Sequence, residues 1–243
     1  MKITSVKNEH IIKLAKLKIK KYRDKFNLYI IENWKIIEEA LKEKIVVEIL
    51  TSNEEFFIKN IKITYVTQEI IKKLSSNKNP QDFIAICKKR EEVKNITDNR
   101  IVVLDNIQDP GNLGTILRNC LSFGFFSLII QGVDVYNEKV IRSSQGAFFH
   151  LNIVQTNNLE LILKNLKDKY FFYGTILNKN SKELATITNN KEKFAIIFGN
   201  EGNGISDQIK KMIDENIYIG INFESLNVAV ANGIILNKFK EIN

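Results

Sequence analysis

The sequence predicts an α/β protein with two parts, a small N-terminal α/β domain over residues 1–90 and a larger domain over residues 101–243. Apolar runs such as IVVLD (101–105) predict strands that are covered on both faces. In the C-terminal part these runs alternate with segments of helical period, which is typical of a parallel sheet with helices on both faces. The polar stretch 88–100 separates the two parts, and we interpret residues 91–100 as the linker.

The N-terminal part mixes short helical and strand patterns. From Ile11 to Tyr22, apolar and basic residues alternate with helical period, and the same period recurs from Trp34 to Lys42. The expected helices are 11–22, 34–42, 53–59 and 68–75, the last with Thr67 as its N-cap, and the expected strands are 45–50, 63–67 and 83–87.

The C-terminal part has a stronger pattern, in which each strand is followed by a helix. A turn at 109–112 leads into a helix that Gly124 ends, because glycine readily takes the left-handed conformation of a helix stop. The expected strands are 101–105, 126–130, 151–156, 170–177, 194–199 and 217–221, and the expected helices are 113–123, 138–149, 159–169, 203–213 and one that begins at Ser225.

The composition favours a polyanionic partner. The chain carries 36 Lys and Arg against 28 Asp and Glu, a formal net charge of +8, which suits nucleic acid, although a generally basic surface is the alternative. The two cysteines and two histidines lack metal-ligand spacing, so we expect no metal and, without a disulfide framework, a cytoplasmic protein. No apolar stretch is long enough to span a bilayer, and the N-terminus has no signal-peptide core.

Three turns between strands and helices carry the residues of chemical interest, and ligands bind at the carboxyl ends of strands in open α/β sheets. In DPGNLGTILRN (109–119), Pro110 and Gly111 predict a tight turn that brings Asn112 and Arg118 together. Arg118 stands in an otherwise apolar helix, where a phosphate or carboxylate partner would offset its burial. The alternative is a capping turn followed by an arginine that reaches solvent.

The second turn, FGNEGNGIS (198–206), has three glycines and Glu201 at its tip. Such a loop permits close backbone contact with a planar ligand, although it lacks the dinucleotide-binding fingerprint and a purely connecting turn is the alternative. In the third, ESLNVAVANG (224–233), Ser225 is the expected N-cap, which leaves Glu224 and Asn227 for ligand contact near free backbone N–H groups.

A basic cluster near the N-terminus is suited to nucleic acid. Lys18, Lys20, Lys21 and Arg23 flank Tyr22, which offers phosphate contacts and a ring for stacking. A solvated helix face is the alternative reading.

Four motifs in order, GNLGTILR, RSSQGAFFHL, FGNEGNGIS and ESLNVAVANGIIL, make the chain resemble the SpoU/TrmH family of RNA 2′-O-ribose methyltransferases in the SPOUT superfamily. SVKN, KLKIKKYR, FNLYIIEN and LSSNKNPQDFIAI resemble that family's small ribosomal-protein-like substrate-binding domain. The resemblance implies a C-terminal α/β-knot, with a deep trefoil knot that binds S-adenosylmethionine. It also implies a homodimer with the active site at the interface.

The resemblance also implies roles for particular residues. Its motifs assign catalysis to Asn112, Arg118, Glu201, Ser225 and Asn227, and cofactor contact, largely through the backbone, to Gly199, Asn200, Ile217, Ile219 and Leu226. Substrate binding is expected of Lys20, Lys21, Arg23 and Arg142. The chain departs from the family pattern at Tyr218 and Ile221 in the cofactor loop, at Asn33, where Glu-Gly is usual, and at Asp82, where Gln-Gly is usual.

Methyl transfer from a sulfonium needs alignment of the ribose oxygen with the methyl carbon and no metal. Because a guanidinium stays protonated, we expect Arg118 to clamp the target phosphate and stabilise charge on the oxygen. Glu201 and Ser225 are expected to relay the proton or orient Arg118.

Other functions stay open at this point. One is a non-catalytic RNA-binding protein on the same scaffold, and another is a Rossmann-type nucleotide enzyme, against which the missing G-x-G-x-x-G counts. Within the family, the N-terminal domain favours ribosomal RNA over transfer RNA.

Overall fold

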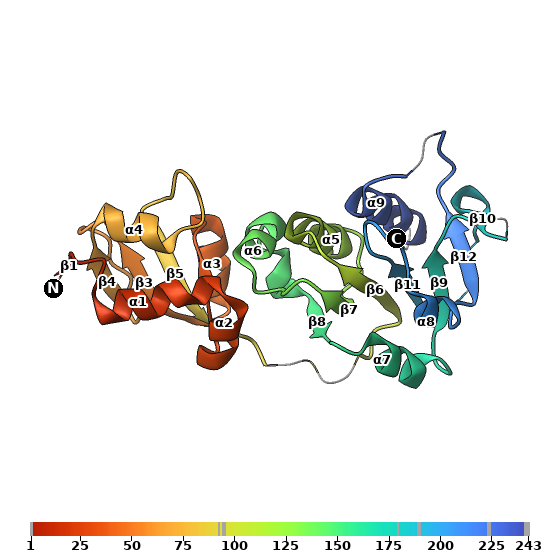
Figure 1. Cartoon of the computed structure of the whole chain (residues 1–243), viewed down its shortest axis with the longest axis horizontal. Coiled ribbons are helices and arrows are strands. Elements are labelled where there is room, and N and C mark those ends of the chain that lie inside the picture. The colour runs from red at the N-terminus through yellow and green to blue at the C-terminus, as the bar shows by residue number, and fades with distance from the viewer. Residues whose placement is uncertain are drawn as a thin grey trace. The chain divides into compact units, whose positions relative to one another are not determined.

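The computed structural model describes residues 2–91, 93, 96–178, 180–188, 191–222 and 225–240. The chain forms two compact units (Figure 1), one of Met1–Glu91 with Asp134–Phe149 and the other of Glu92–Val133 with His150–Asn243. Each unit is built on its own sheet.

The N-terminal unit has a mixed five-stranded sheet in the order β1-β4-β3-β5-β2. The first three strands run parallel to one another, whereas β5 is antiparallel to both β3 and β2. The strands are β1 (Lys2–Ile3), β2 (Leu28–Ile31), β3 (Val46–Thr51), β4 (Lys62–Val66) and β5 (Phe83–Lys88). The helices are α1 (Glu9–Ala15), α2 (Lys20–Phe26), α3 (Trp34–Lys42) and α4 (Gln68–Leu74). Isoleucine and leucine side chains of α1, α4 and the strands form one buried core.

Two expectations for this unit are wrong. The segment 11–22 is not one helix, because Ile19 takes an extended backbone (φ −103°, ψ 127°) after a short 3-10 turn, η1 (Lys16–Lys18), and α2 starts again at Lys20. Residues 53–59 form turns, in which the Asn53 side chain accepts the backbone N–H of Glu55. Thr67 is the N-cap of α4, as expected, although its hydroxyl makes no capping hydrogen bond. The strand β2 was not expected from the sequence.

The second unit has a seven-stranded sheet in the order β10-β12-β9-β11-β6-β7-β8, and all its strand pairs are parallel, which confirms the predicted parallel sheet. The strands are β6 (Arg100–Ile107), β7 (Ser127–Gly132), β8 (Asn152–Gln155), β9 (Phe171–Thr175), β10 (Lys182–Glu183), β11 (Phe194–Phe198) and β12 (Glu215–Tyr218).

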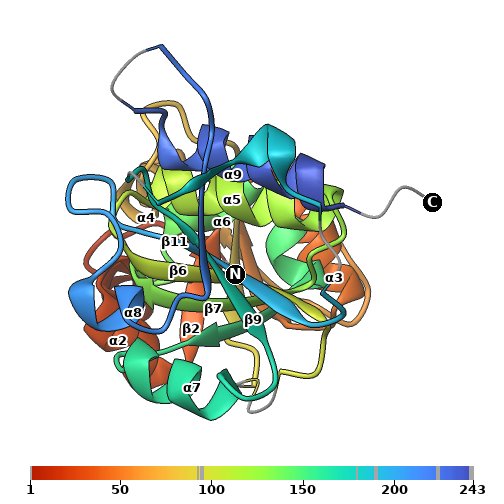
Figure 2. The ribbon, with the colours of Figure 1, turned by 90° about the vertical axis from the view of Figure 1, so that its right-hand side faces the viewer.

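Helices cover both faces of this sheet, as the apolar strands require. Two of them, α5 (Pro110–Ser122) and α9 (Val228–Phe239), pack side by side on one face, and α7 (Leu159–Leu166) and α8 (Asp207–Lys210) lie on the other (Figures 1 and 2). A 3-10 turn, η3 (Leu184–Thr186), follows β10.

Several boundaries in this unit differ from the prediction. Pro110 and Gly111 are not a turn ahead of the helix but the first turn of α5 itself, with Asp109 as N-cap. The helix expected at 203–213 shrinks to α8, because Gly204 has φ 68° and closes the preceding loop. The strand expected at 217–221 is shifted to 215–218, because the pairing with β9 ends where Ile217 meets Thr175.

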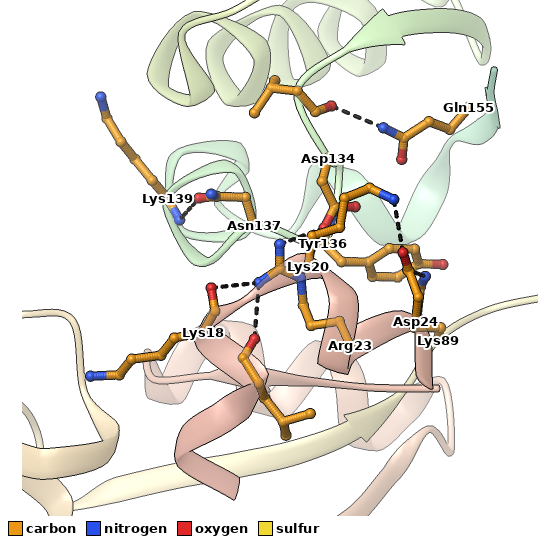
Figure 3. Close-up of polar contacts among 12 residues, drawn as sticks. Lys18, Lys20, Arg23, Asp24, Lys89, Asp134, Tyr136, Asn137, Lys139 and Gln155 are labelled. Carbon is orange, nitrogen blue, oxygen red and sulfur yellow. Dashed lines mark hydrogen bonds and ion pairs between the residues drawn. The ribbon is translucent and has the colours of Figure 1, made fainter. Parts of the chain in front are cut away.

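Residues 134–149, between β7 and β8, belong to the N-terminal unit, although both flanking strands lie in the other. This segment holds α6 (Glu138–Ser144) and most of the 3-10 turn η2 (Ala147–His150), since Gln145 and Gly146, with φ 50° and 92°, end the helix expected to reach 149. The Arg23 guanidinium, 3% exposed, donates to Asp134 Oδ2 from Nε at 2.8 Å and from Nη2 at 2.6 Å (Figure 3). This buried ion pair holds Asp134, at the start of the segment, against α2.

Within the described residues, no helix is both long enough and apolar enough to cross a membrane.

Candidate active site

The Glu201 carboxylate joins the glycine-rich loop after β11 to the start of α5. Its Oε2 accepts the backbone N–H of Gln108 at 3.2 Å, and its Oε1 accepts the backbone N–H of Asp109 at 3.1 Å. The same Oε1 accepts the Asn112 side-chain amide at 3.1 Å. One side chain therefore holds two of the three predicted turns together.

The third turn joins through Asn227. Its side-chain Nδ2 donates to Asn112 Oδ1 at 2.9 Å, while its Oδ1 accepts the backbone N–H of Ala229 at 2.9 Å. Asn227, not Ser225, is thus the N-cap of α9, and the expectation that Ser225 caps this helix is wrong. Asn227 is favoured as the N-cap because its side-chain amide bonds both to a backbone N–H at the helix end and to the Asn112 side chain. Glu224 lies outside the described residues.

Hydrogen bonding sets the charge of Glu201. Partial burial acts to raise the pKa of this carboxyl, but the hydrogen bonds from the Asn112 amide and from the backbone at Asp109 and Gln108 outweigh it and hold the pKa below its ordinary value. The group is therefore ionised at neutral pH and acts as a fixed acceptor. The folded-state pKa is depressed, so the stabilising contribution of this network is present at neutral pH and is lost as the pH falls through that pKa.

A cavity of about 490 Å³ opens beside this network, at the carboxyl ends of β9, β11 and β12. All five residues expected to contact the cofactor line it, together with Glu201, Ser225 and Asn227. Tyr218 and Ile221, the departures from the family pattern, also lie on its wall. The lining combines exposed loop backbone with isoleucine and leucine side chains, a combination that suits a flat ligand with polar edges.

Glycine at position 199 is required by the path of this loop. A Cβ there would lie 2.1 Å from the carbonyl carbon of Gly204 and 2.2 Å from the nitrogen of Ile205. The two ends of the loop cannot separate freely, because the backbones of Asn200 and Gly204 hydrogen-bond to each other in both directions at 2.9 Å. The cavity wall is therefore built from backbone packed against backbone.

Arg118 does not join the cluster within one chain. Asn112 and Arg118 both lie in α5, so they are separated by about 9 Å along the axis and about 120° around it. The expected turn that would bring them together is absent from the described residues. Arg118 is exposed, and none of the described residues pairs with its guanidinium, which matches the alternative of an arginine that reaches solvent after a capping turn.

The residues expected to bind substrate differ in their availability. Lys21 is exposed and has no partner in the described part of the chain, whereas Lys20 pairs with Asp24 at 2.8 Å. Arg23 is buried in its ion pair with Asp134, so an RNA contact would have to break that pair. Arg142 donates to Asn77 Oδ1 at 2.6 Å.

Sequence reasoning missed the polar contact between α5 and α9. Asn119 Nδ2 donates to the Ala229 carbonyl at 2.9 Å and to Asn232 Oδ1 at 3.1 Å, and Asn232 is fully buried. Gly233 leaves room for it, because a Cβ there would stand 3.2 Å from Asn119 Nδ2. The run of small residues around Gly233 was the available signal, but it pointed only to close packing. No cluster of three or more potential metal ligands occurs among the described residues.

Comparisons with known proteins show the family of the chain. The model of the SpoU rRNA Methylase family matches residues 99–237, and the model of the MRM3-like substrate binding domain matches residues 8–85. The chain is 34% identical over 243 residues to the 23S rRNA (guanosine(2553)-2'-O)-methyltransferase RlmP of Bacillus subtilis (strain 168), covering 96% of this chain and 97% of that relative.

Two solved structures share the fold. The AdoMet-bound rRNA methyltransferase from Sinorhizobium meliloti superposes with a TM-score of 0.85 at 24% identity, over 98% of this chain and 96% of that one. The SpoU methyltransferase AviRb from Streptomyces viridochromogenes, in complex with the cofactor AdoMet, gives a TM-score of 0.83 at 19% identity, over 96% and 97%.

These matches define the class of protein, an S-adenosylmethionine-dependent RNA 2′-O-methyltransferase. The chain belongs to the SpoU rRNA methylase family and carries an N-terminal substrate-binding domain of the MRM3-like type.

Proposed function

We propose that this enzyme methylates the ribose 2′-hydroxyl of a guanosine in 23S ribosomal RNA, in the cytoplasm. The main support for the catalytic site is the series of hydrogen bonds from Asn227 through Asn112 to Glu201, which brings three turns together at the rim of one cavity. The choice of RNA is supported by the near full-length similarity to the B. subtilis relative, whose name specifies such a guanosine.

The cavity fits the methyl donor in size and in kind. Gly199 and Asn200 offer backbone groups on one side, and Ile217, Ile219 and Leu226 offer apolar surface for an adenine ring. When bound, S-adenosylmethionine supplies an electrophilic methyl group on a sulfonium, so no metal is needed. We propose that the loops around it follow the trefoil-knotted path expected from the family resemblance.

Glu201 positions the site and does not take up the proton. Its carboxylate is already committed to three donors, and its lowered pKa makes it a weak base at neutral pH. It fixes Asn112, and Asn112 in turn fixes Asn227, so that the amide groups face the cavity rim in one orientation. Ser225, exposed on the cavity wall, is free to contact the ribose hydroxyl.

Arg118 is proposed to serve the active site of a partner subunit in a homodimer. It projects from a different side of α5 from Asn112, and its guanidinium, without a partner in the described part of the chain, is available to clamp a phosphate. On the neighbouring helix α9, Val230 and Ile234 are 51% and 41% exposed one turn apart. Two large apolar side chains on one exposed helix face favour a protein interface.

Replacing Ile234 with lysine should convert the dimer to a monomer, because a charge would have to be buried in the apolar interface. Sedimentation velocity would measure the change, and methyl transfer should fall with the dimer. Leu161→Lys is the matched control, since Leu161 is 56% exposed on α7, on the opposite face of the sheet. An Ile234→Lys protein that stayed dimeric would place the interface elsewhere.

Lys20 and Lys21, at the start of α2, are proposed to contact RNA phosphates. Replacing Lys21 with glutamine should weaken RNA binding and reduce the slope of log K against log salt by about 1, the effect of one lost phosphate contact. Filter binding over a salt series would measure both. Lys42→Gln, at an exposed lysine paired with Glu39 on α3, is the control. An unchanged slope would remove Lys21 from the interface.

The function is tested by mass-spectrometric mapping of ribose methylation in RNA from cells with and without this protein. The expected result is the loss of one 2′-O-methylguanosine from 23S ribosomal RNA and no change in transfer RNA. A loss confined to transfer RNA would show that the substrate assignment is wrong, and no loss in either RNA would contradict the proposed activity.

A further inference from the structure

A second cavity, of about 400 Å³, lies on the other side of the glycine-rich loop from the first. Asn200 and Gly204 line both cavities, but the second is otherwise formed at the carboxyl ends of β6, β7, β8 and β11. From β6 the chain proceeds to β7 and β8 in one direction, and β11 lies on the other side of β6. This is the point where the strand order reverses, at which open α/β sheets bind ligands.

The lining of this second cavity is rich in carboxamides, and its charged members are two carboxylates, Asp105 and Glu160, which are engaged by Ser206 and Lys164. Seven of its thirteen lining residues are asparagine or glutamine, and no lysine or arginine is among them. Without cations the cavity is unsuited to phosphate, so its ligand should be neutral and carry both donors and acceptors. The amide residues are Asn106, Gln131, Asn157, Asn158, Asn200, Asn203 and Gln208.

Part of this lining is held rigidly by the protein. Buried Asp105 accepts the backbone N–H of Ser206 at 2.7 Å, and Asn200 Nδ2 donates to the carbonyl of Asn106 at 2.8 Å. Asn106 takes the left-handed conformation, with φ 58°, which asparagine adopts more readily than most other non-glycine residues. Gln131 uses its side-chain oxygen to accept the N–H of Leu159, which leaves its NH₂ group to donate.

Three of the remaining carboxamides are unengaged, whereas Asn158 accepts the backbone N–H of Leu161. The side chains of Asn157, Asn203 and Gln208 are exposed and make no hydrogen bond to the described residues. Three free carboxamides thus surround a preformed frame, and a carboxamide can donate and accept at once against a base edge, as it does with adenine.

We propose that this cavity binds a nucleobase of the substrate RNA by its hydrogen-bonding edge and thereby contributes to the choice of methylation site. The assignment rests on the proposed function in one respect, that the ligand is part of an RNA. The base and the methyl donor then lie on opposite sides of the loop that carries Glu201, so that one loop contacts and positions both ligands.

The test uses the triple variant Asn157→Ala, Asn203→Ala, Gln208→Ala, whose side chains hold no structural contacts among the described residues. The probes are four short fluorescent single-stranded RNAs that differ only in their central base. The full-length wild-type protein should prefer one base by about tenfold or more, and the triple variant should lose that preference. Asn165→Ala, an exposed amide farther along α7, should bind as wild type.

The outcomes separate this inference from the proposed function. A base preference that survives in the triple variant overturns the inference, even if the wild type methylates ribosomal RNA. A variant that loses dimerisation also overturns it, because the cavity would then be a protein interface. If the wild type transfers no methyl group but the base preference disappears in the variant, the inference stands and the activity assignment fails.

Discussion

Replacing Arg118 with alanine is expected to reduce methyl transfer by at least about a hundredfold, as the loss of one preorganised charge donor does elsewhere. The Kd for S-adenosylmethionine should not change, because Arg118 does not line the cavity proposed for it. The fold should persist, since Arg118 is exposed. Arg118→Lys should recover only part of the activity, because an ammonium lacks the guanidinium fork. Single-turnover transfer and equilibrium dialysis of the labelled donor measure the two quantities.

Near-normal turnover by Arg118→Ala would contradict the catalytic assignment. A mixing experiment then tests whether the arginine acts across a dimer. Inactive Arg118→Ala is combined with a variant defective in donor binding. If the arginine acts in trans, mixed dimers will contain one site with both defects and one intact site, whereas if it acts in cis each site will carry one defect. Recovered activity supports action in trans, whereas its absence places both residues in the same site.

The donor-binding variant follows from Gly199. Alanine at this position would force its Cβ to within 2.1 Å of the Gly204 backbone, so the loop must open and the cavity wall must shift. The Kd for S-adenosylmethionine is expected to rise by about tenfold or more, as measured by isothermal titration calorimetry.

Gly202→Ala is the matched control, because its Cβ would meet only the Asn200 side chain, at an ordinary 3.6 Å. Circular dichroism shows whether each variant is folded. A folded Gly199→Ala protein with unchanged donor affinity would contradict the proposal that this loop forms the donor site.

The parallel sheet was predictable because its central strands are continuous apolar runs in the sequence. IVVL in β6 and FAIIF in β11 are continuous apolar runs, which only a strand covered on both faces can bury. The edge of the sheet was not predictable in the same way. Strand β10 has only two residues, and the pairing of β12 with β9 ends at Ile217 opposite Thr175, which the local sequence does not indicate.

The site residues show the same limit. Ser225 and Asn227 are both good N-caps, and local sequence cannot choose between them. The choice depends on Asn112, 115 positions away in the sequence, which takes the Asn227 amide. Arg23 stands in a basic helix that reads as solvent-facing, yet Asp134, 111 positions away, keeps it buried. In each case a contact between distant residues settled what the local pattern left open.

The pairing of Arg23 with Asp134 connects residues 1–91 of this chain to a segment from the second half of the sequence. A fragment that ends at residue 91 keeps the arginine but loses both the carboxylate and the segment 134–149 that packs with it. Removing one partner of a buried ion pair costs about 3–5 kcal/mol. Residues 1–91 alone are therefore expected to be less stable than the same residues joined to 134–149.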